Sequence, residues 1–430
     1  MKERNGQLRY LSIVIGAFLS VGVIVGLTNN LYSLYVIPIT TGLGISRGLY
    51  SMGITVRYIA SAFCNLFMGR LYQRFGYRRP TVLLVLLVAA SYVGYGTARN
   101  AVPLFLGALI YGVGEYFIST AALSRMLGNW FQSHLGVVTG IVMAASGVGG
   151  SALSLVLSGI MESAGWRTSL LFAAGRLAAV AVMIFFVMKD RPEELGLQPY
   201  HDPERRGAAH KPKKVAAPWA GVPMQVLLKK PYFYLTMIGM MLATIASNGV
   251  YSAVVPHLQD RGLSAAYAAK MLSLMLVLLA VDKIVLGMLA DRFGAHFSTL
   301  LCVLFTFSGI VVLTLVKNEW QAVIAVVLLS VSVCLNGFIQ PLLAAEIFGR
   351  SAYNTTLGIM MAMLSVGGLL SSPLVNFSFD ATGSYTRILI VLAVIAAVDA
   401  LFLLPAFHAE AKYRRELETS GQLSDAGPET

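Results

Sequence analysis

Long apolar segments, separated by short polar turns, run along almost the whole chain. A helix needs about 20 mostly apolar residues to cross a bilayer. The segments do not alternate with period two, so helices are expected rather than strands. The pattern predicts twelve spans, at residues 11–39, 49–68, 80–98, 102–127, 135–161, 168–188, 232–256, 264–286, 297–316, 320–345, 354–377 and 385–407.

The composition favours a membrane protein over a soluble one. Of the 430 residues, 57% are hydrophobic and 12% are charged, and the mean hydropathy is +0.73. A soluble chain of this length would need two or three domains with polar surfaces, and the polar residues are too few to cover them. We therefore expect an all-α membrane protein with twelve transmembrane helices. The first apolar run is too long for the core of a signal peptide, so we expect it to be retained.

Membrane topology accounts for most of the net charge of +12. Lysine and arginine concentrate on the segments that share a side with the N-terminus. The positive-inside rule then predicts a multi-pass protein of the plasma (inner) membrane, with cytoplasmic termini and a cytoplasmic 189–230 segment. That segment reads as a linker with a short amphipathic helix near 221–229, and the tail is expected to fray from about residue 408. A nucleic-acid partner is not expected, because no compact basic domain exists to bind one.

The second half of the chain repeats the first. GRLYQRFG at 69–76 matches GMLADRFG at 287–294, with five identities in eight positions and an offset of 218 residues. The same offset relates Asn30 to Asn248 and Pro38 to Pro256. Duplicated six-span halves place a substrate site near the midplane, and transport follows as one half rocks against the other. We expect a bundle, a linker, a second bundle and a cytoplasmic tail, at 1–188, 189–230, 231–407 and 408–430.

The paired GxLxxRFG loops resemble the signature loop of the major facilitator superfamily. A similarity to its monocarboxylate transporter and oxalate/formate antiporter branch is visible in NWFQSHLGVVTGIVMAASGVGG (129–150), GWR (165–167) and RPEELGL (191–197). The resemblance implies the major facilitator fold, with two pseudo-symmetric six-helix bundles. It also implies gating roles for loop residues Gly69, Arg74, Gly287, Asp291 and Arg292.

Charged residues within the spans are the main chemical signal, because burying an ion at bilayer depth is costly. In the branch that the chain resembles, an arginine four residues before the loop glycine binds the substrate carboxylate, and here Lys283 holds that position. Alternatively, Lys283 and its neighbour Asp282 lie near the inner mouth and pair with water or other helices. Oxalate-type antiporters also carry a lysine midway along the eleventh helix, where this chain has Leu364. The resemblance therefore favours a monocarboxylate over a dicarboxylate, unless Arg57 supplies a second positive charge.

Two further charges lie within spans of the first half. Arg57 precedes Gly69 by about 18 Å of helix, which places it at mid-membrane. It either binds an anion or pairs with Glu115 on the fourth predicted span. Glycines 112 and 114 are expected to open space beside Glu115. A buried glutamate can exchange protons near neutral pH, so Glu115 is the expected proton-coupling site, with Asp282 as a second candidate.

Polar side chains interrupt the first, seventh and tenth predicted spans. Kinked segments that carry amides and hydroxyls suit a ligand site at the midplane. The alternative is ordinary hydrogen bonding between helices. We group these side chains with Arg57 and Lys283 as candidate substrate contacts: Asn29, Asn30, Tyr32, Asn248, Tyr251 and Asn336.

The function expected is secondary active transport of a small organic anion, with a monocarboxylate favoured, by proton symport or anion exchange. The alternative is export of a hydrophobic or cationic compound by proton antiport, with Glu115 as the anchor. No HExxH, GxSxG or Walker motif is present, so neither an enzyme nor a cofactor or metal is expected. The expected partners are the organic anion, protons in the symport case and the lipid bilayer, and we expect a monomer.

Overall fold

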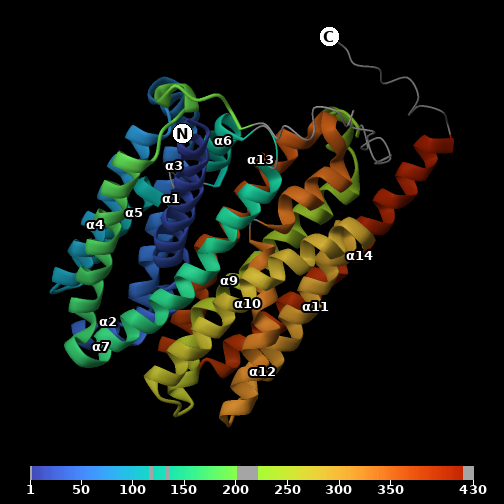
Figure 1. Cartoon of the computed structure of the whole chain (residues 1–430). Helices are drawn as coiled ribbons and strands as arrows, with labels where there is room; N and C mark the ends of the chain where they lie inside the picture. The colour runs from blue at the N-terminus through green and yellow to red at the C-terminus, as the bar shows by residue number, and fades with distance from the viewer. Residues whose placement is uncertain are drawn as a thin grey trace. The chain divides into compact units, whose positions relative to one another are not determined.

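The computed structural model describes residues 2–115, 120–131, 133, 135–200, 221–336 and 338–419, and helices make up most of them (Figure 1). The elements are α1 (Lys2–Asn30), α2 (Tyr32–Leu43), α3 (Arg47–Phe75), α4 (Arg78–Thr97), α5 (Ala101–Glu115), α6 (Thr120–Trp130), α7 (Leu135–Val187), η2 (Pro192–Leu195), α8 (Met224–Leu227), α9 (Pro231–Asp260), α10 (Ala265–Phe293), α11 (Ala295–Thr314), α12 (Glu319–Ser330), η4 (Val331–Leu335), α13 (Ile339–Thr382) and α14 (Thr386–Thr419).

Helices occupy every segment predicted to span the membrane. Among the described residues, eight helices are long and apolar enough to cross a bilayer, or nine if the bent pair around η4 counts as one span. The fifth and sixth predicted spans form α7, in which Gly165 interrupts helical geometry at φ +83°. Gly349 interrupts α13 in the same way at φ +69°. The all-helical membrane architecture predicted from hydropathy is therefore confirmed.

The chain forms two compact units. Unit 1 comprises Met1–Ala209, Ser252–Ala280 and Phe379–Gly383, and unit 2 comprises His210–Tyr251, Val281–Ser378 and Ser384–Thr430. In unit 1, α7 packs against α1 and α4, and α5 packs against α3 and α4 (Figure 1). In unit 2, α11 packs against α12, η4 and α14. Unit 1 thus combines the first sequence repeat with the end of α9, part of α10 and the end of α13.

The polar break predicted in the first span is present, whereas the matching break in the seventh is not. Leu31 separates α1 from α2 with φ −118° and ψ 9°. Helix α9 runs without interruption through Asn248, so the helix is not unwound there. The break lies in the tenth span instead, where η4 ends at Asn336 with φ −95° and ψ 80°.

The polar residues of α9 stabilise the break in the tenth span. The Asn336 amide donates to Ser247 Oγ at 3.1 Å and to Asn248 Oδ1 at 2.8 Å. Ser247 in turn donates to the carbonyl of Ser332, inside η4, at 2.8 Å. A broken helix leaves backbone groups without partners inside the helix, and they must be satisfied within the protein when water is excluded. The amide and hydroxyl groups of the seventh span therefore form hydrogen bonds with the broken tenth span, while their own helix remains continuous.

The C-terminal tail does not fray at residue 408, as had been expected, because α14 continues to Thr419. The Lys230 ammonium lies 3.7 Å from the centroid of the Tyr413 ring, and the Tyr232 ring lies 6.2 Å from it. Glu410 is buried. Alanine, glutamate, lysine and arginine in this stretch are good helix formers. Hydropathy marks the end of the apolar span here, but not the end of the helix.

The first part of the predicted linker folds onto unit 1. The backbone N–H of Tyr200 donates to the Trp130 carbonyl at 2.7 Å, and Tyr200 forms an isolated β-bridge with Phe131. The amphipathic helix expected near 221–229 is a single turn, α8. Residues 201–220 lie outside the described part of the chain.

The two repeated loops end in the same way. Gly76 has φ +72° and Gly294 has φ +89°. After Gly76, the Asp190 carboxylate accepts backbone N–H groups at the start of α4 at 2.7 and 2.9 Å. After Gly294, the Glu346 carboxylate accepts a backbone N–H at the start of α11. An anion at a helix N-terminus satisfies free N–H groups and matches the helix dipole. A Cβ at Gly294 would lie 2.7 Å from a Glu346 oxygen, so a glycine is required there by both backbone angle and space.

We expect Gly294→Ala to destabilise the protein by about 1–3 kcal/mol, because alanine is strained at this backbone angle and its Cβ displaces Glu346. The measurement is the thermal unfolding midpoint of the purified protein in detergent. Gly358→Ala is the matched control, since an added Cβ at Gly358, in α13, meets nothing within 4 Å. Equal midpoints for the two variants would contradict the role of Gly294.

Candidate functional site

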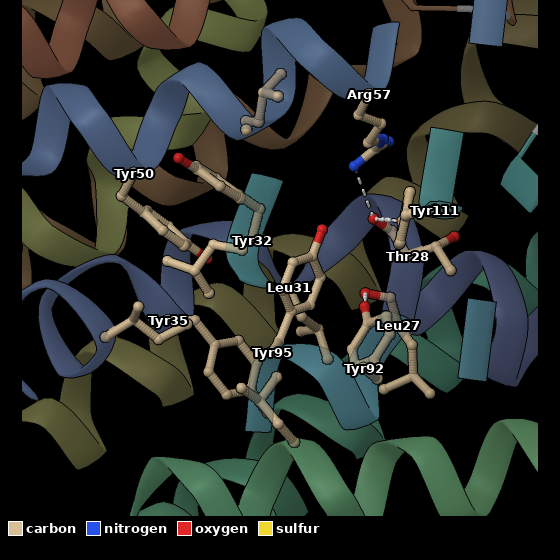
Figure 2. A pocket seen from close by; sticks show the side chains of 15 residues that line it. Leu27, Thr28, Leu31, Tyr32, Tyr35, Tyr50, Arg57, Tyr92, Tyr95 and Tyr111 are labelled. Carbon is tan, nitrogen blue, oxygen red and sulfur yellow. Dashed lines mark hydrogen bonds between the residues drawn. The ribbon is translucent and has the colours of Figure 1, made fainter. Parts of the chain in front are cut away.

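A cavity in unit 1 lies between the break in the first span and helices α3, α4, α5 and α7 (Figure 2). It holds about 600 Å³ of empty volume, counting its open side. Of the described residues that line it, Arg57 alone carries a charge. Six tyrosines form much of the wall: Tyr32, Tyr35, Tyr50, Tyr92, Tyr95 and Tyr111. Six aliphatic side chains complete it, namely Leu27, Leu31, Ile39, Ile54, Leu104 and Leu170. We call this the tyrosine cavity.

Arg57 is held against the end of α1. Its guanidinium donates to the Thr28 carbonyl at 3.3 Å and to Asn29 Oδ1 at 2.7 Å. Carbonyls in the last turn of a helix lack partners within that helix, and the negative end of the helix dipole attracts a cation. The break at Leu31 therefore creates the acceptors that position Arg57. Both acceptors are neutral, so these two bonds leave the positive charge of the guanidinium in place.

Three of the six tyrosines have hydroxyls that are hydrogen-bonded to other parts of unit 1. Tyr92 and Tyr111 donate to backbone carbonyls in the last turn of α1, the first at 2.9 Å. The Tyr35 hydroxyl is hydrogen-bonded to Ser169 on α7 at 2.8 Å. Three hydroxyls are thus bonded to the surrounding protein, which leaves ring surface facing the cavity.

Two ring contacts shape opposite parts of the cavity, as Figure 2 shows. The Tyr32 and Tyr50 rings are stacked, with centroids 5.1 Å apart and planes inclined by 6°. The Arg57 guanidinium lies 4.5 Å from the centroid of the Tyr111 ring, in a cation–π contact. The charged end of the cavity is therefore separate from the stacked pair.

Close approach of α5 to α3 occurs at Arg57. A Cβ added to Gly112 would lie 3.0 Å from Arg57 Cα, and one added to Gly114 would lie 2.9 Å from the Leu84 carbonyl oxygen. Neighbouring helices therefore pack directly against both glycines. Glu115 ends α5, and its side chain lies outside the described part of the structure.

The structure brings together three of the residues predicted for the site in the first repeat. Arg57 and Tyr32 line the cavity, and Asn29 is hydrogen-bonded to Arg57. Asn30 points elsewhere, because its amide donates to the Ser146 carbonyl on α7 at 3.1 Å. Asn30 thus links two helices rather than lining the cavity.

The predicted residues of unit 2 form a second polar group, around the break in the tenth span. Lys283 on α10 lies near the Cys334 thiol of η4. The neighbouring Asp282 lies near the Ser330 hydroxyl, and its buried Oδ2 has no hydrogen-bond partner among the described residues. Asn336 is hydrogen-bonded to Asn248, as described above. Tyr251 lies one turn further along α9.

The residues predicted to form the gating loops lie at the ends of α3 and α10, at equivalent places in the two repeats. Arg74 and Arg292 are exposed, and each guanidinium lies over the ring of the next residue, at 5.4 and 5.2 Å from the centroid. Asp291 is exposed as well. Gly69 lies within α3, and a Cβ at Gly287 would touch the Phe338 ring at 3.6 Å.

A charged cluster at the other end of unit 1 was not singled out from the sequence. Both terminal nitrogens of Arg47, at the start of α3, donate hydrogen bonds to the Asp260 carboxylate, at 2.6 and 2.9 Å. Asp380 accepts the backbone N–H groups of residues 47 and 48 at 3.0 and 2.7 Å. The Arg47 guanidinium also lies 3.8 Å from the Phe379 ring centroid. This Arg47 cluster (Arg47, Asp260, Phe379 and Asp380) joins α3 to the ends of α9 and α13. The sequence feature that could have indicated this cluster is the presence of charged residues at helix ends on the side of the membrane where few charges are predicted.

Comparison with known proteins identifies the family. The family profile described as "Major Facilitator Superfamily" matches residues 17–345. The chain belongs to the Major Facilitator Superfamily. Monocarboxylate transporter 12 of Rattus norvegicus is 25% identical over 361 residues, covering 78% of this chain and 71% of that protein. The uncharacterized MFS-type transporter YcxA of Bacillus subtilis (strain 168) is 23% identical over 393 residues, covering 88% and 91%.

Solved structures of the superfamily share the fold. A D-xylose–proton symporter aligns with TM-score 0.70 at 15% identity, covering 91% of this chain and 97% of that one. A bacterial homologue of the human lysosomal transporter Spinster, inward-facing and unoccupied, aligns with TM-score 0.69 at 16% identity, covering 94% and 98%. The resemblance and fold class inferred from the repeated loops are therefore confirmed. This superfamily member is a multi-pass membrane transporter and not an enzyme.

Proposed function

We propose that this transporter carries a small organic anion, with a monocarboxylate favoured, by secondary active transport and alternating access. The observation that supports this most is Arg57, a guanidinium on the wall of a cavity otherwise lined by tyrosines, aliphatic side chains, Thr28 and a glycine. A guanidinium binds a carboxylate through two parallel charge-assisted hydrogen bonds. The distant similarity to a protein named as a monocarboxylate transporter agrees with this proposal.

Lys283 is proposed as a second cation for the substrate. It is partly buried on α10, and the polar groups of η4 and Asn336 lie in the same unit. We expect Lys283→Gln to abolish carboxylate transport and Lys283→Arg to retain part of it. Losing a charge-assisted hydrogen bond in a dry site costs about 1.5–3 kcal/mol, which is roughly tenfold to more than a hundredfold in affinity. Substrate binding by the purified variants is the measurement, and unchanged binding by Lys283→Gln would remove Lys283 from the site.

Energy coupling is proposed to use either protons or a second anion. Asp282 and Glu115 are the carboxylates proposed to carry protons, because an acid buried in a span is costly to keep charged. An imposed pH gradient that drives substrate accumulation would support symport. Counterflow without a response to the gradient would support exchange.

The Arg47 cluster is proposed to close the end of unit 1 that topology predicts to face outward. Alternating access needs contacts that hold one end shut while the other is open. A bidentate arginine–carboxylate pair, with a second carboxylate at the start of the same helix, is such a contact.

The test of the proposed function is flux in proteoliposomes that contain the purified protein. Labelled monocarboxylates and a cationic dye are offered in parallel, with protein-free liposomes as the control. Saturable carboxylate flux supports the proposal. Proton-driven dye flux without carboxylate flux would instead support the export of hydrophobic or cationic compounds.

A further inference from the structure

We propose that the tyrosine cavity selects monocarboxylates that carry an aromatic ring over short aliphatic acids. The inference rests on the proposed function and names the substrate class of the same site. Three features of the cavity carry it: the ring surface of its wall, the single charge at one end and the number of apolar residues that line it.

The wall suits a flat apolar group. Tyr35, Tyr92 and Tyr111 have their hydroxyls bonded to the surrounding protein, so they offer ring faces rather than donors to a ligand. Tyr32 and Tyr50 already form a parallel stack. Aromatic rings gain from offset stacking and edge contacts beyond the burial of their area. A ligand ring placed among these residues would extend the existing arrangement.

The charge suits one carboxylate. Arg57 is the single ionised group among the described lining residues, and its position is fixed by bonds to the end of α1. A second charged group on the ligand would lie against tyrosine rings and aliphatic side chains. Burying such a group without a partner is costly. The cavity therefore favours an acid whose remaining part is apolar.

A ligand cation is disfavoured, although tyrosine cages do bind quaternary ammonium groups. Here the Arg57 guanidinium already occupies a face of Tyr111, at 4.5 Å from the centroid. A second cation in the same cavity would be repelled by it at low dielectric. Aliphatic side chains also make up as much of the wall as tyrosines do.

The apolar wall argues against the smallest acids. Twelve of the described lining residues are tyrosines or aliphatic residues. A two- or three-carbon acid bound at Arg57 would leave most of the apolar wall in contact with water. A phenyl group would cover that wall, and the apolar area removed from water would add to affinity.

The experiment compares four probes that share a two-carbon chain and differ in the group at one end or the other. Thermal-shift assays use the whole protein in detergent, and counterflow assays use it in liposomes. The probes are 3-phenylpropionate, propionate, 3-phenylpropionamide and 2-phenylethylammonium. We expect 3-phenylpropionate to bind about tenfold or more tighter than propionate. We also expect it to bind about tenfold or more tighter than the neutral amide, which lacks the charge that Arg57 recognises.

Two variants locate the preference in the cavity. Tyr50→Ala is expected to lower the ratio of 3-phenylpropionate to propionate affinity several-fold, and Tyr50→Phe to keep it, because the stack needs the ring alone. Leu104→Phe, which adds a ring to the wall, is expected to lower the same ratio by filling the space. The Leu104→Phe variant provides the test if the Tyr50→Ala variant does not fold. Tyr234→Ala is the control, since Tyr234 is an exposed tyrosine of unit 2, and its ratio should match the wild type.

The outcomes separate the two levels of the proposal. If propionate binds as tightly as 3-phenylpropionate, the ring preference is wrong while carboxylate transport stands. Equal ratios in wild type, Tyr50→Ala and Leu104→Phe would place the preference outside the cavity and overturn the inference. Tighter binding of the ammonium probe would overturn both. If none of the acids is bound or exchanged, the proposed function itself fails.

Discussion

The Arg57→Gln variant is expected to bind its carboxylate substrate roughly tenfold to a hundredfold more weakly than the wild type. The change removes the single charge among the described lining residues of the tyrosine cavity, and with it the charge-assisted hydrogen bonds to the ligand. Isothermal titration or thermal-shift titration of the purified variant gives the affinity directly. Counterflow in liposomes then shows whether transport is lost with binding.

Arg57 also satisfies carbonyls at the end of α1, so a loss of fold has to be separated from a loss of binding. Arg57→Lys keeps the cation and is expected to retain part of the affinity, although a point charge replaces the planar fork. Asn29→Ala removes one bond to the guanidinium but no charge, and serves as the structural control. If Arg57→Gln melts like the wild type and binds substrate equally well, Arg57 is not the anion anchor.

Replacing Arg47 with alanine is expected to shift the protein towards the outward-open state by about 1.5–3 kcal/mol. The variant loses two hydrogen bonds to Asp260 and the contact with the Phe379 ring, and it leaves the Asp260 carboxylate without this partner. The measurement is the rate at which a membrane-impermeant maleimide labels a cysteine at Ile39, a buried residue of the cavity wall, from the outer side. Labelling of the variant should be faster by roughly tenfold or more.

A charge reversal provides the control for this prediction. Arg47→Asp combined with Asp260→Arg restores an ion pair with the opposite polarity, so labelling should return towards the wild-type rate. Arg47→Asp alone should label at least as fast as Arg47→Ala, because like charges then face each other. Labelling that is independent of all these changes would show that the cluster does not hold this end closed.

The helical segments were predictable because apolar runs of membrane length report burial in lipid directly. The two local errors come from properties that hydropathy does not measure. Helix α14 continues to Thr419 through polar residues that favour helix and pack on Tyr232. The segment Val331–Leu335 has neither glycine nor proline, so its 3-10 turn was signalled in the sequence only by the polar residue Asn336 that ends it.

The candidate site was predictable only in part. Arg57 and Asn29 stood out because a charge and an amide within apolar spans are costly unless they are partnered or used. Of the six tyrosines only Tyr32 stood out, since they come from four helices and each resembles ordinary packing on its own. Their convergence is a tertiary property, as is the meeting of Arg47 with Asp260 and Asp380 across more than 200 residues of sequence.

The continuation of α14 past the predicted end of the last span offers a handle for imaging. Residues 408–419 add about 18 Å of helix at 1.5 Å per residue. This extension is not a free stalk, because the Tyr413 ring contacts both Lys230 and Tyr232. A helical marker protein fused in register at Leu417, without a flexible linker, would keep a fixed orientation relative to unit 2. Such a marker would add to this 46.2 kDa transporter an asymmetric mass that supports particle alignment in electron cryomicroscopy.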